Sequence, residues 1–212
     1  DAYPVDGLFL DCFDLARCYG LECLEAMARR KLDPGDDAAA ADFARLATVR
    51  FLARVRALCR RLGKEVSLCF NSMPCRLQSR HIELEILPTS ARWGYDALPF
   101  QVRYARTLGK PVVVMTGRFH KGWGDFGGLR PDPSLRYDCF NAVANGAGCS
   151  IGDHLHPRGR LEPAVYEAVG RVYREVRRYD PWTEGARALA DMAVFYPPLE
   201  APRWCPDYAE AT

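Results

Sequence analysis

Residues 7–13 read Gly7-Leu8-Phe9-Leu10-Asp11-Cys12-Phe13, an apolar run that stops on a carboxylate. A continuous apolar run of this length is typical of a strand buried on both faces, as strands in parallel α/β sheets are. An Asp where such a strand ends lies at the carboxyl edge of the sheet, where open α/β sheets and barrels place their sites. The run therefore predicts a buried strand with Asp11 at a functional edge.

The same unit, a strand followed by a helix, recurs along the rest of the chain. Further strands are predicted at residues 66–70, 81–86, 111–115 and 147–152, and another beginning at 192–196. Helices are predicted at residues 21–30, 38–62, 99–108, 132–145 and 163–179. This alternation indicates right-handed βαβ units, and hence a parallel sheet with flanking helices. An open doubly wound sheet and part of a barrel both fit it, since a whole (β/α)8 barrel usually needs about 250 residues.

The composition of the chain indicates which partners and which cellular compartment to expect. The 212 residues are 49% hydrophobic, enough for one domain with a substantial core. The arginines of residues 45–61 lie within one amphipathic segment, so we expect a solvated helix face and no nucleic-acid partner. No apolar stretch approaches the roughly 20 residues of a membrane span, so no membrane association is expected. Nine cysteines without paired metal-type spacing favour reduced thiols and a cytoplasmic setting.

Polar residues gather just after the predicted strand ends. They are Asp11, Asn71, Glu83, Glu85, Thr116, His120, Asp125, Asp153, His154 and His156. The ends of parallel strands in a closed sheet converge on one mouth, so these residues are expected to become neighbours. Glu83 and Glu85 alternate with aliphatic residues on their strand, and buried carboxylates without partners cost free energy, so the pair indicates a functional use. The alternative is an amphipathic edge strand with solvated glutamates.

The loop over residues 117–128 combines glycines, aromatic rings and charges. Aromatic rings stack on sugar or base faces, and glycines let the backbone approach a ligand. Its spacing matches neither the dinucleotide fingerprint nor the P-loop. Trp93 and Tyr95 offer a second aromatic platform, although either tryptophan, Trp93 or Trp123, could instead fill the core.

Residues 153–157, Asp153-His154-Leu155-His156-Pro157, could bind a metal, since His-x-His with a carboxylate suits zinc. Hydrogen bonding of Asp153 and His156 to substrate hydroxyls is the preferred interpretation. We therefore expect no metal and no cofactor, and keep a metal-dependent hydrolase using Asp153, His154 and His156 as an alternative.

Several of these segments resemble a family of hypothetical glycosyl hydrolases related to α-L-fucosidase-like barrels. The matching stretches are residues 3–11, 81–85, 117–120, 123–127 and 150–157. Members of that family are often followed by a domain resembling the β-galactosidase trimerisation domain. The likeness spans most of residues 1–182, and residues 188–197 look like the entry to that second domain.

The resemblance implies the C-terminal part of a (β/α)8 TIM barrel, strands four to eight, over residues 1–182. Residues 183–212 would form a linker and the start of a truncated trimerisation-like domain. In related barrels an Asp ending the fourth strand is the nucleophile, and Asp11 matches that position. Several such barrels hold the acid/base after the sixth strand, where Glu85 falls. The resemblance also implies a carbohydrate substrate and, for the full-length protein, a homo-oligomer.

Two carboxylates suffice for the implied chemistry, since one attacks the anomeric carbon while the other protonates the leaving oxygen. We therefore expect retaining hydrolysis of an O-glycosidic bond, with Asp11 as nucleophile and Glu85 as acid/base. The residues expected to bind the sugar are Asn71, Glu83, Trp93, Tyr95, His120, Trp123, Asp125, Asp153 and His156. A catalytically inactive carbohydrate-binding barrel or fragment is the alternative from another class.

Overall fold

The computed structural model describes residues 5–12, 16–61, 66–71, 80–90, 93–123 and 125–195. The described residues divide into two compact units. The first contains the described residues up to 71 together with 194–195, and the second contains those from 80 to 193. Each unit carries its own parallel sheet, and the two are treated separately below.

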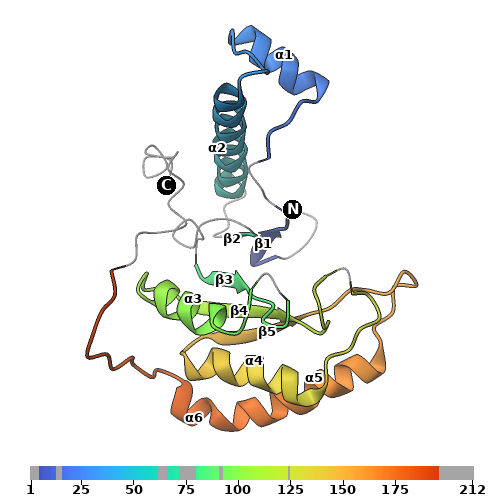
Figure 1. The fold of residues 1–212 in the computed structure, drawn as a ribbon, viewed down its shortest axis with the longest axis vertical. Helices are drawn as coiled ribbons and strands as arrows, with labels where there is room; N and C mark the ends of the chain where they lie inside the picture. The colour runs from blue at the N-terminus through green and yellow to red at the C-terminus, as the bar shows by residue number, and fades with distance from the viewer. Residues whose placement is uncertain are drawn as a thin grey trace. The chain divides into compact units, whose positions relative to one another are not determined.

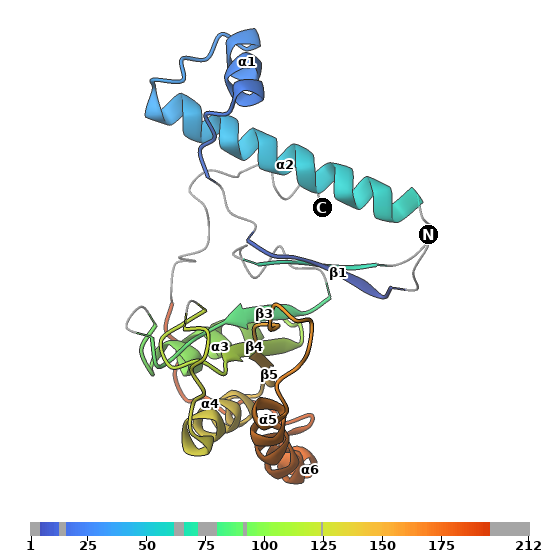
Figure 2. The same cartoon turned by 90° about the vertical axis from the view of Figure 1, so that its right-hand side faces the viewer.

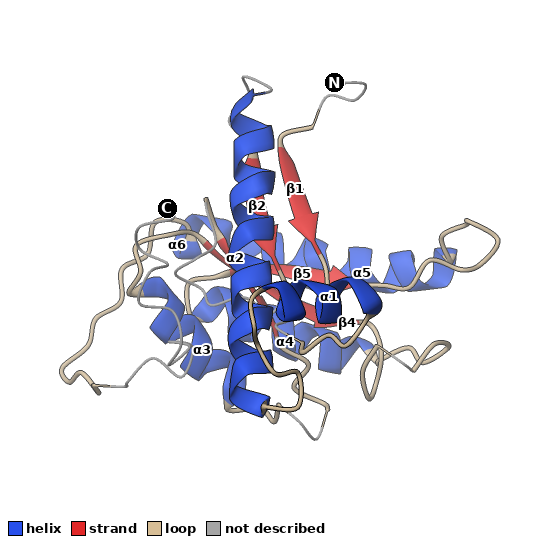
Figure 3. Cartoon of the chain, turned by 90° about the horizontal axis from the view of Figure 1, so that it is seen from above, coloured by secondary structure: helices blue, strands red, loops and turns tan. Residues whose placement is uncertain are grey.

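The first unit is built on a two-stranded sheet. Strand β1 (Gly7–Leu10) pairs in parallel with β2 (Ser67–Phe70), and Leu10 lies opposite Phe70 at the carboxyl end. Helices α1 (Leu21–Arg29) and α2 (Asp37–Arg61) connect the strands. The short α1 lies across the first turns of α2 (Figures 2 and 3), where Met27 packs against Ala40 and Phe43.

The prediction of a strand buried on both faces was wrong for β1. Leu8 and Phe9, which lie on opposite faces of the strand, are 38% and 46% exposed. Within the described residues β1 pairs with β2 alone. The strand is also shorter than predicted: it ends at Leu10, and the chain turns at Asp11 and Cys12. Cys12 adopts a φ of 51°, a left-handed conformation that cannot continue a strand. Phe13 lies outside the described residues.

The second unit is a three-stranded parallel sheet in the order β3-β4-β5. Its elements are β3 (Ile82–Glu85), α3 (Ala97–Arg106), β4 (Val112–Gly117), α4 (Asp132–Ala144), β5 (Gly148–Gly152) and α5 (Pro163–Val176). A 3₁₀ turn, η2 (Arg177–Tyr179), and the short α6 (Asp180–Thr183) follow. Helices α3, α4 and α5 gather on one face of the sheet (Figures 1 and 2).

The core of this unit lies between the sheet and its helices. Ile82 and Leu84 of β3 pack with Val114 of β4, Val102 of α3 and Ala142 of α4. Side chains alternate along a strand, so residues 83 and 85 of β3 lie on the face away from this core. A parallel sheet covered by helices on one face is the arrangement found in the wall of a (β/α)8 barrel.

The structure confirms an α/β fold with parallel sheets and flanking helices, as part of a TIM-barrel-like fold has. The five strands of the described ranges form sheets of two and three, and no closed barrel. No strand begins at residues 192–195 in the described part of the chain; Val194 and Phe195 there are 86% and 91% exposed, without the burial that would stabilise one. The expected boundary near residue 182 stays a prediction. None of the described helices has the length and apolar character that crossing a bilayer requires.

Candidate functional site

Asp11 and Asn71 meet at the carboxyl ends of β1 and β2. The register that pairs Leu10 with Phe70 brings the next residue of each strand side by side. Asn71 Nδ2 donates a hydrogen bond to Asp11 Oδ1 at 2.7 Å, and the backbone N–H of Cys12 donates to the same oxygen at 2.8 Å. These two hydrogen bonds, that from Asn71 first, lower the pKa of Asp11 below its ordinary value. Asp11 is thus an exposed carboxylate whose charged form is favoured by these hydrogen bonds.

The two glutamates of β3 have different surroundings. Burial raises the pKa of Glu83, although the imidazole of His81, with Nε2 3.7 Å from Glu83 Oε2, opposes that rise. Glu85 is two residues nearer the carboxyl end, and its Oε1 accepts a hydrogen bond from Trp123 Nε1 at 2.7 Å. Glu85 is therefore joined to the loop that follows β4.

Aromatic rings from two loops form a cluster beside Glu85. Phe119 and Trp123, from the loop after β4, contact each other with ring centroids 5.6 Å apart. His154, from the segment after β5, lies 4.5 Å from the Phe119 ring and 5.8 Å from the Trp123 ring. Phe126 stacks on His154 at 5.8 Å and also contacts His156 at 6.3 Å. The cluster gives the strand ends a partly apolar, aromatic lining, as ligand-binding sites have.

Arg118 links the loop after β4 to the segment after β5 through an ion pair. Its Nε donates to Asp153 Oδ1 at 2.6 Å, and its Nη1 donates to the carbonyl oxygen of Gly128 at 2.6 Å. Its guanidinium also lies over the Phe119 ring, 4.6 Å from the centroid. Reasoning from the sequence did not single out Arg118. The sequence does offer one signal for it: Arg118 follows directly after the buried strand β4, which ends at Gly117.

Asp125 accepts hydrogen bonds from the backbone of the loop in which it lies. Its Oδ2 accepts the backbone N–H groups of His120 at 3.0 Å and Lys121 at 3.4 Å. A Cβ at Gly128 would lie 2.4 Å from the same oxygen, so a side chain there would displace the Asp125 carboxylate. The contacts of Asp125 hold the loop that carries His120, and the expected roles of both residues toward a sugar stay predictions.

Trp93 and Tyr95, the second predicted aromatic platform, have different surroundings. Trp93 is partly buried against the core between β3 and α3, the alternative that the sequence left open for it. Tyr95 is exposed, and its ring meets Tyr137 of α4 edge to face at 5.4 Å. Of the two, only Tyr95 has its ring largely on the surface.

The structure gives no support to a metal site at residues 153–156. The ligand atoms of Asp153, His154 and His156, all within the described ranges, do not all lie within 4.8 Å of one another. Asp153 is paired with Arg118, and His156 Nδ1 accepts the backbone N–H of Arg158 at 3.1 Å.

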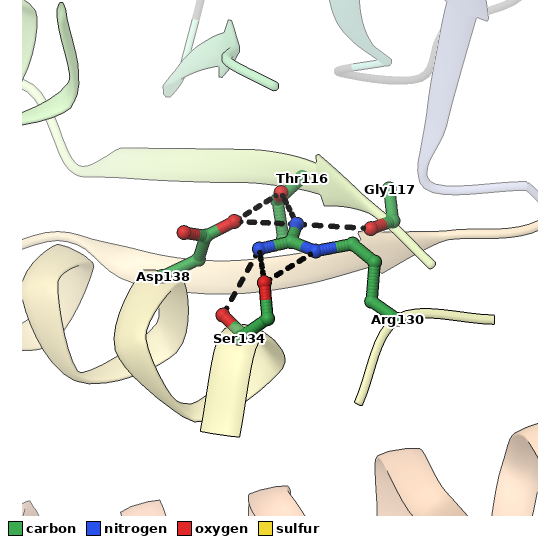
Figure 4. Close-up of polar contacts among 5 residues, drawn as sticks. All are labelled: Thr116, Gly117, Arg130, Ser134 and Asp138. Carbon is green, nitrogen blue, oxygen red and sulfur yellow. Dashed lines mark hydrogen bonds and ion pairs between the residues drawn. The ribbon is translucent and has the colours of Figure 1, made fainter. Parts of the chain in front are cut away.

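A buried ion pair lies behind the strand ends (Figure 4). Arg130 Nη1 donates to Asp138 Oδ2 at 2.6 Å, and Thr116 Oγ1 donates to the same oxygen at 2.7 Å. Nη2 of Arg130 donates to the hydroxyl and the carbonyl oxygen of Ser134 at 2.7 and 2.9 Å. The network links the end of β4 to the first turns of α4, and Arg130 itself belongs to the loop between them. No local pattern in the sequence indicates this pairing of Arg130 with Asp138.

These features define a class of protein. In the second unit, parallel strands covered by helices on one face carry a carboxylate, an arginine and aromatic rings beyond their carboxyl ends, where α/β barrels place their active sites. In the first unit, Asp11 and Asn71 lie at the carboxyl ends of β1 and β2. Parallel strands followed by helices are the units from which a TIM-barrel-like fold is built.

A solved structure of the same class is similar to this chain. It is α-L-fucosidase isoenzyme 2 from Paenibacillus thiaminolyticus, with 37% sequence identity and a TM-score of 0.79. The match covers 90% of this chain and 30% of the fucosidase chain. The chain therefore has a glycoside-hydrolase-like fold and spans less than a third of that enzyme. No protein-family profile matches the chain, and no curated protein does.

Proposed function

We propose that this chain is part of a glycoside hydrolase that cleaves an O-glycosidic bond, with an α-L-fucoside as the substrate to test first. The observation that carries the proposal is the 37% identity to an α-L-fucosidase over 90% of the chain, with a TM-score of 0.79. Because the match covers 30% of the fucosidase, the activity is proposed for the whole protein.

In the proposed reaction Asp11 attacks the anomeric carbon and forms a covalent glycosyl-enzyme. Asn71 and Cys12 support this role, because their hydrogen bonds keep the attacking carboxylate ionised. Glu85 transfers a proton to the leaving oxygen as the glycosidic bond breaks, and then accepts a proton from the water that hydrolyses the intermediate. The anomeric configuration is thereby retained.

We expect polar and aromatic groups near the strand ends to bind the sugar. The rings of Phe126 and His156 offer apolar area to the C–H face of a pyranose. Glu83, Asn71 and His120 are polar groups that suit hydroxyl recognition. We propose these roles together with those expected for Trp123, Asp125, Asp153 and Tyr95.

The test is hydrolysis of 4-nitrophenyl α-L-fucoside, and of a panel of other nitrophenyl glycosides, by the full-length protein. Asp11→Asn and Glu85→Gln should each lower kcat/KM by about a hundredfold or more, the scale of a lost acid–base or nucleophilic group. Asp191→Asn and Glu167→Gln, at exposed carboxylates, are the matched controls and should retain activity. Proton NMR of the first-formed sugar should show the anomer of the substrate.

Three outcomes would contradict the proposal. Normal turnover by the Asp11→Asn and Glu85→Gln variants would remove both assignments. Sugar binding without turnover in the unaltered protein would indicate an inactive carbohydrate-binding barrel. Loss of activity on chelation, restored by zinc, would indicate the metal-dependent alternative.

A further inference from the structure

Gly152, the last residue of β5, is in contact with the indole of Trp123. A Cβ added at Gly152 would lie 2.2 Å from Cη2 and 2.7 Å from Cζ3 of that indole. Both distances are below 3.0 Å, which Cβ atoms essentially never show. The indole can occupy its observed place because residue 152 has no side chain.

The other edge of the same indole reaches Glu85. Trp123 Nε1 donates to Glu85 Oε1 at 2.7 Å. β3 and β5 lie on opposite sides of β4, so the indole of Trp123 extends across the end of β4, from Gly152 on one outer strand to Glu85 on the other. Because the indole is one rigid plane, we expect a group that pushes the ring off Gly152 to shift the Nε1 donor relative to Glu85.

Two further rings limit where the indole can go. Phe119 meets it edge to face at 5.6 Å, and His154 lies 5.8 Å from it at an interplanar angle of 39°. Phe119 is itself 2% exposed and therefore packed in place. The indole thus has one well-defined position, bounded by Gly152, Phe119 and His154.

We propose that Gly152 is a positioning residue for Glu85, acting through the Trp123 indole, and that proton transfer to the glycosidic oxygen is carried by Glu85 Oε2. The indole N–H is a donor, so it pairs with the carbonyl oxygen of the protonated acid and with the same oxygen of the carboxylate. In the first step the proton leaves Oε2 for the oxygen of the breaking glycosidic bond; in the second, Oε2 takes a proton from water. The catalytic part of this inference rests on the proposed function, whereas the contact of Gly152, Trp123 and Glu85 does not.

The test compares Gly152→Ala with Gly148→Ala in the full-length protein. Gly148 lies in the same strand, and a Cβ there would meet its nearest atom, Val113 Cγ2, at an ordinary 3.7 Å. Loss of one hydrogen bond to the acid should lower kcat/KM of Gly152→Ala, which reports the first step, by about tenfold on a substrate with a poor leaving group. On a 2,4-dinitrophenyl glycoside, whose leaving group needs no proton, the loss of kcat/KM should disappear. Gly148→Ala should match the unaltered protein on both substrates.

A second readout does not depend on activity. The indole N–H resonance of Trp123, assigned in a ¹⁵N-correlated NMR spectrum by its absence in Trp123→Phe, should move in Gly152→Ala and stay in place in Gly148→Ala. An unmoved resonance would overturn the positioning role, whether or not the protein is a glycosidase. A moved resonance with equal loss of kcat/KM on both substrates would overturn the assignment of proton transfer. If the resonance moves but the unaltered protein has no glycosidase activity, the contact of Gly152, Trp123 and Glu85 is supported and the proposed function is refuted.

Discussion

Replacing Arg130 with methionine tests the buried ion pair that supports the loop between β4 and α4. Both side chains of the Arg130–Asp138 pair are 1% exposed, and their closest atoms lie 2.6 Å apart. Asp138 Oδ2 also accepts a hydrogen bond from Thr116, while Oδ1 is buried without a partner within the described residues. Asp138 therefore depends on Arg130 to offset the cost of burying its charge.

The expected cost follows from that dependence. Removing one partner of a buried pair leaves an uncompensated charge and destabilises by about 3–5 kcal/mol. In a chain of this length 1 kcal/mol corresponds to about 2–4 °C, so Arg130→Met should lower Tm by about 6–20 °C. Changing Asp138 to leucine in the same protein removes the stranded charge, so the double variant should regain most of the loss.

Urea titration followed by far-UV circular dichroism measures the free energy of unfolding, and a thermal melt with the same signal measures Tm. Arg171→Met is the control, because the Arg171–Asp132 pair also involves α4 but has side chains 54% and 39% exposed. Exposed pairs contribute about 0–1 kcal/mol, so this variant should unfold close to the unaltered protein. The reasoning is refuted if Arg130→Met loses no more than Arg171→Met, or if the double variant is as unstable as Arg130→Met alone.

Three further predictions concern the site. Asn71→Leu removes the main hydrogen bond that lowers the pKa of Asp11, so that pKa should rise toward 3.8 and shift the acid limb of a kcat/KM–pH profile upward. Burial raises the pKa of Glu83 above 4.5, so native stability should fall as pH rises through the folded-state pKa. Glu83→Gln should therefore show a gain in unfolding free energy over the unaltered protein that is larger near pH 8 than near pH 4, measured by urea titration. Gly128→Ala places a Cβ 2.4 Å from Asp125 Oδ2 and should displace the loop, lowering Tm by about 2–12 °C at a typical overpacking cost of about 1–3 kcal/mol.

Each of these has a contradicting result. An acid limb that stays in place in Asn71→Leu would mean that Asp11 does not set it. Equal pH dependence of stability with and without Glu83 would mean that this carboxyl is solvated. An unchanged Tm in Gly128→Ala would mean that Asp125 does not pack against residue 128.

Local pattern in the sequence accounts for much of the fold. The uninterrupted apolar residues 111–115 predict a strand, and β4 covers Val112–Gly117. The alternation at 81–86 predicts two faces, and the structure buries Ile82 and Leu84 while leaving Glu83 and Glu85 on the other side. Such patterns are readable because side-chain direction follows the strand period of two, which is a property of the backbone alone.

The same local reasoning failed at β1. Its composition predicts burial on both faces, yet Leu8 and Phe9 are exposed. Burial depends on which elements cover a strand, and the apolar residues of the strand do not specify those elements.

What the sequence by itself determined is the parallel α/β class and the acidic and aromatic residues near the strand ends, because periodicity and turn chemistry act over a few residues. Only the tertiary structure decided how those residues pair. Arg118 reaches Asp153, 35 positions away, and Trp123 reaches Glu85, 38 positions away. The indole of Trp123 depends in turn on the missing side chain of Gly152. Contacts of this range depend on strand register and on the course of loops between strands, which no local pattern encodes.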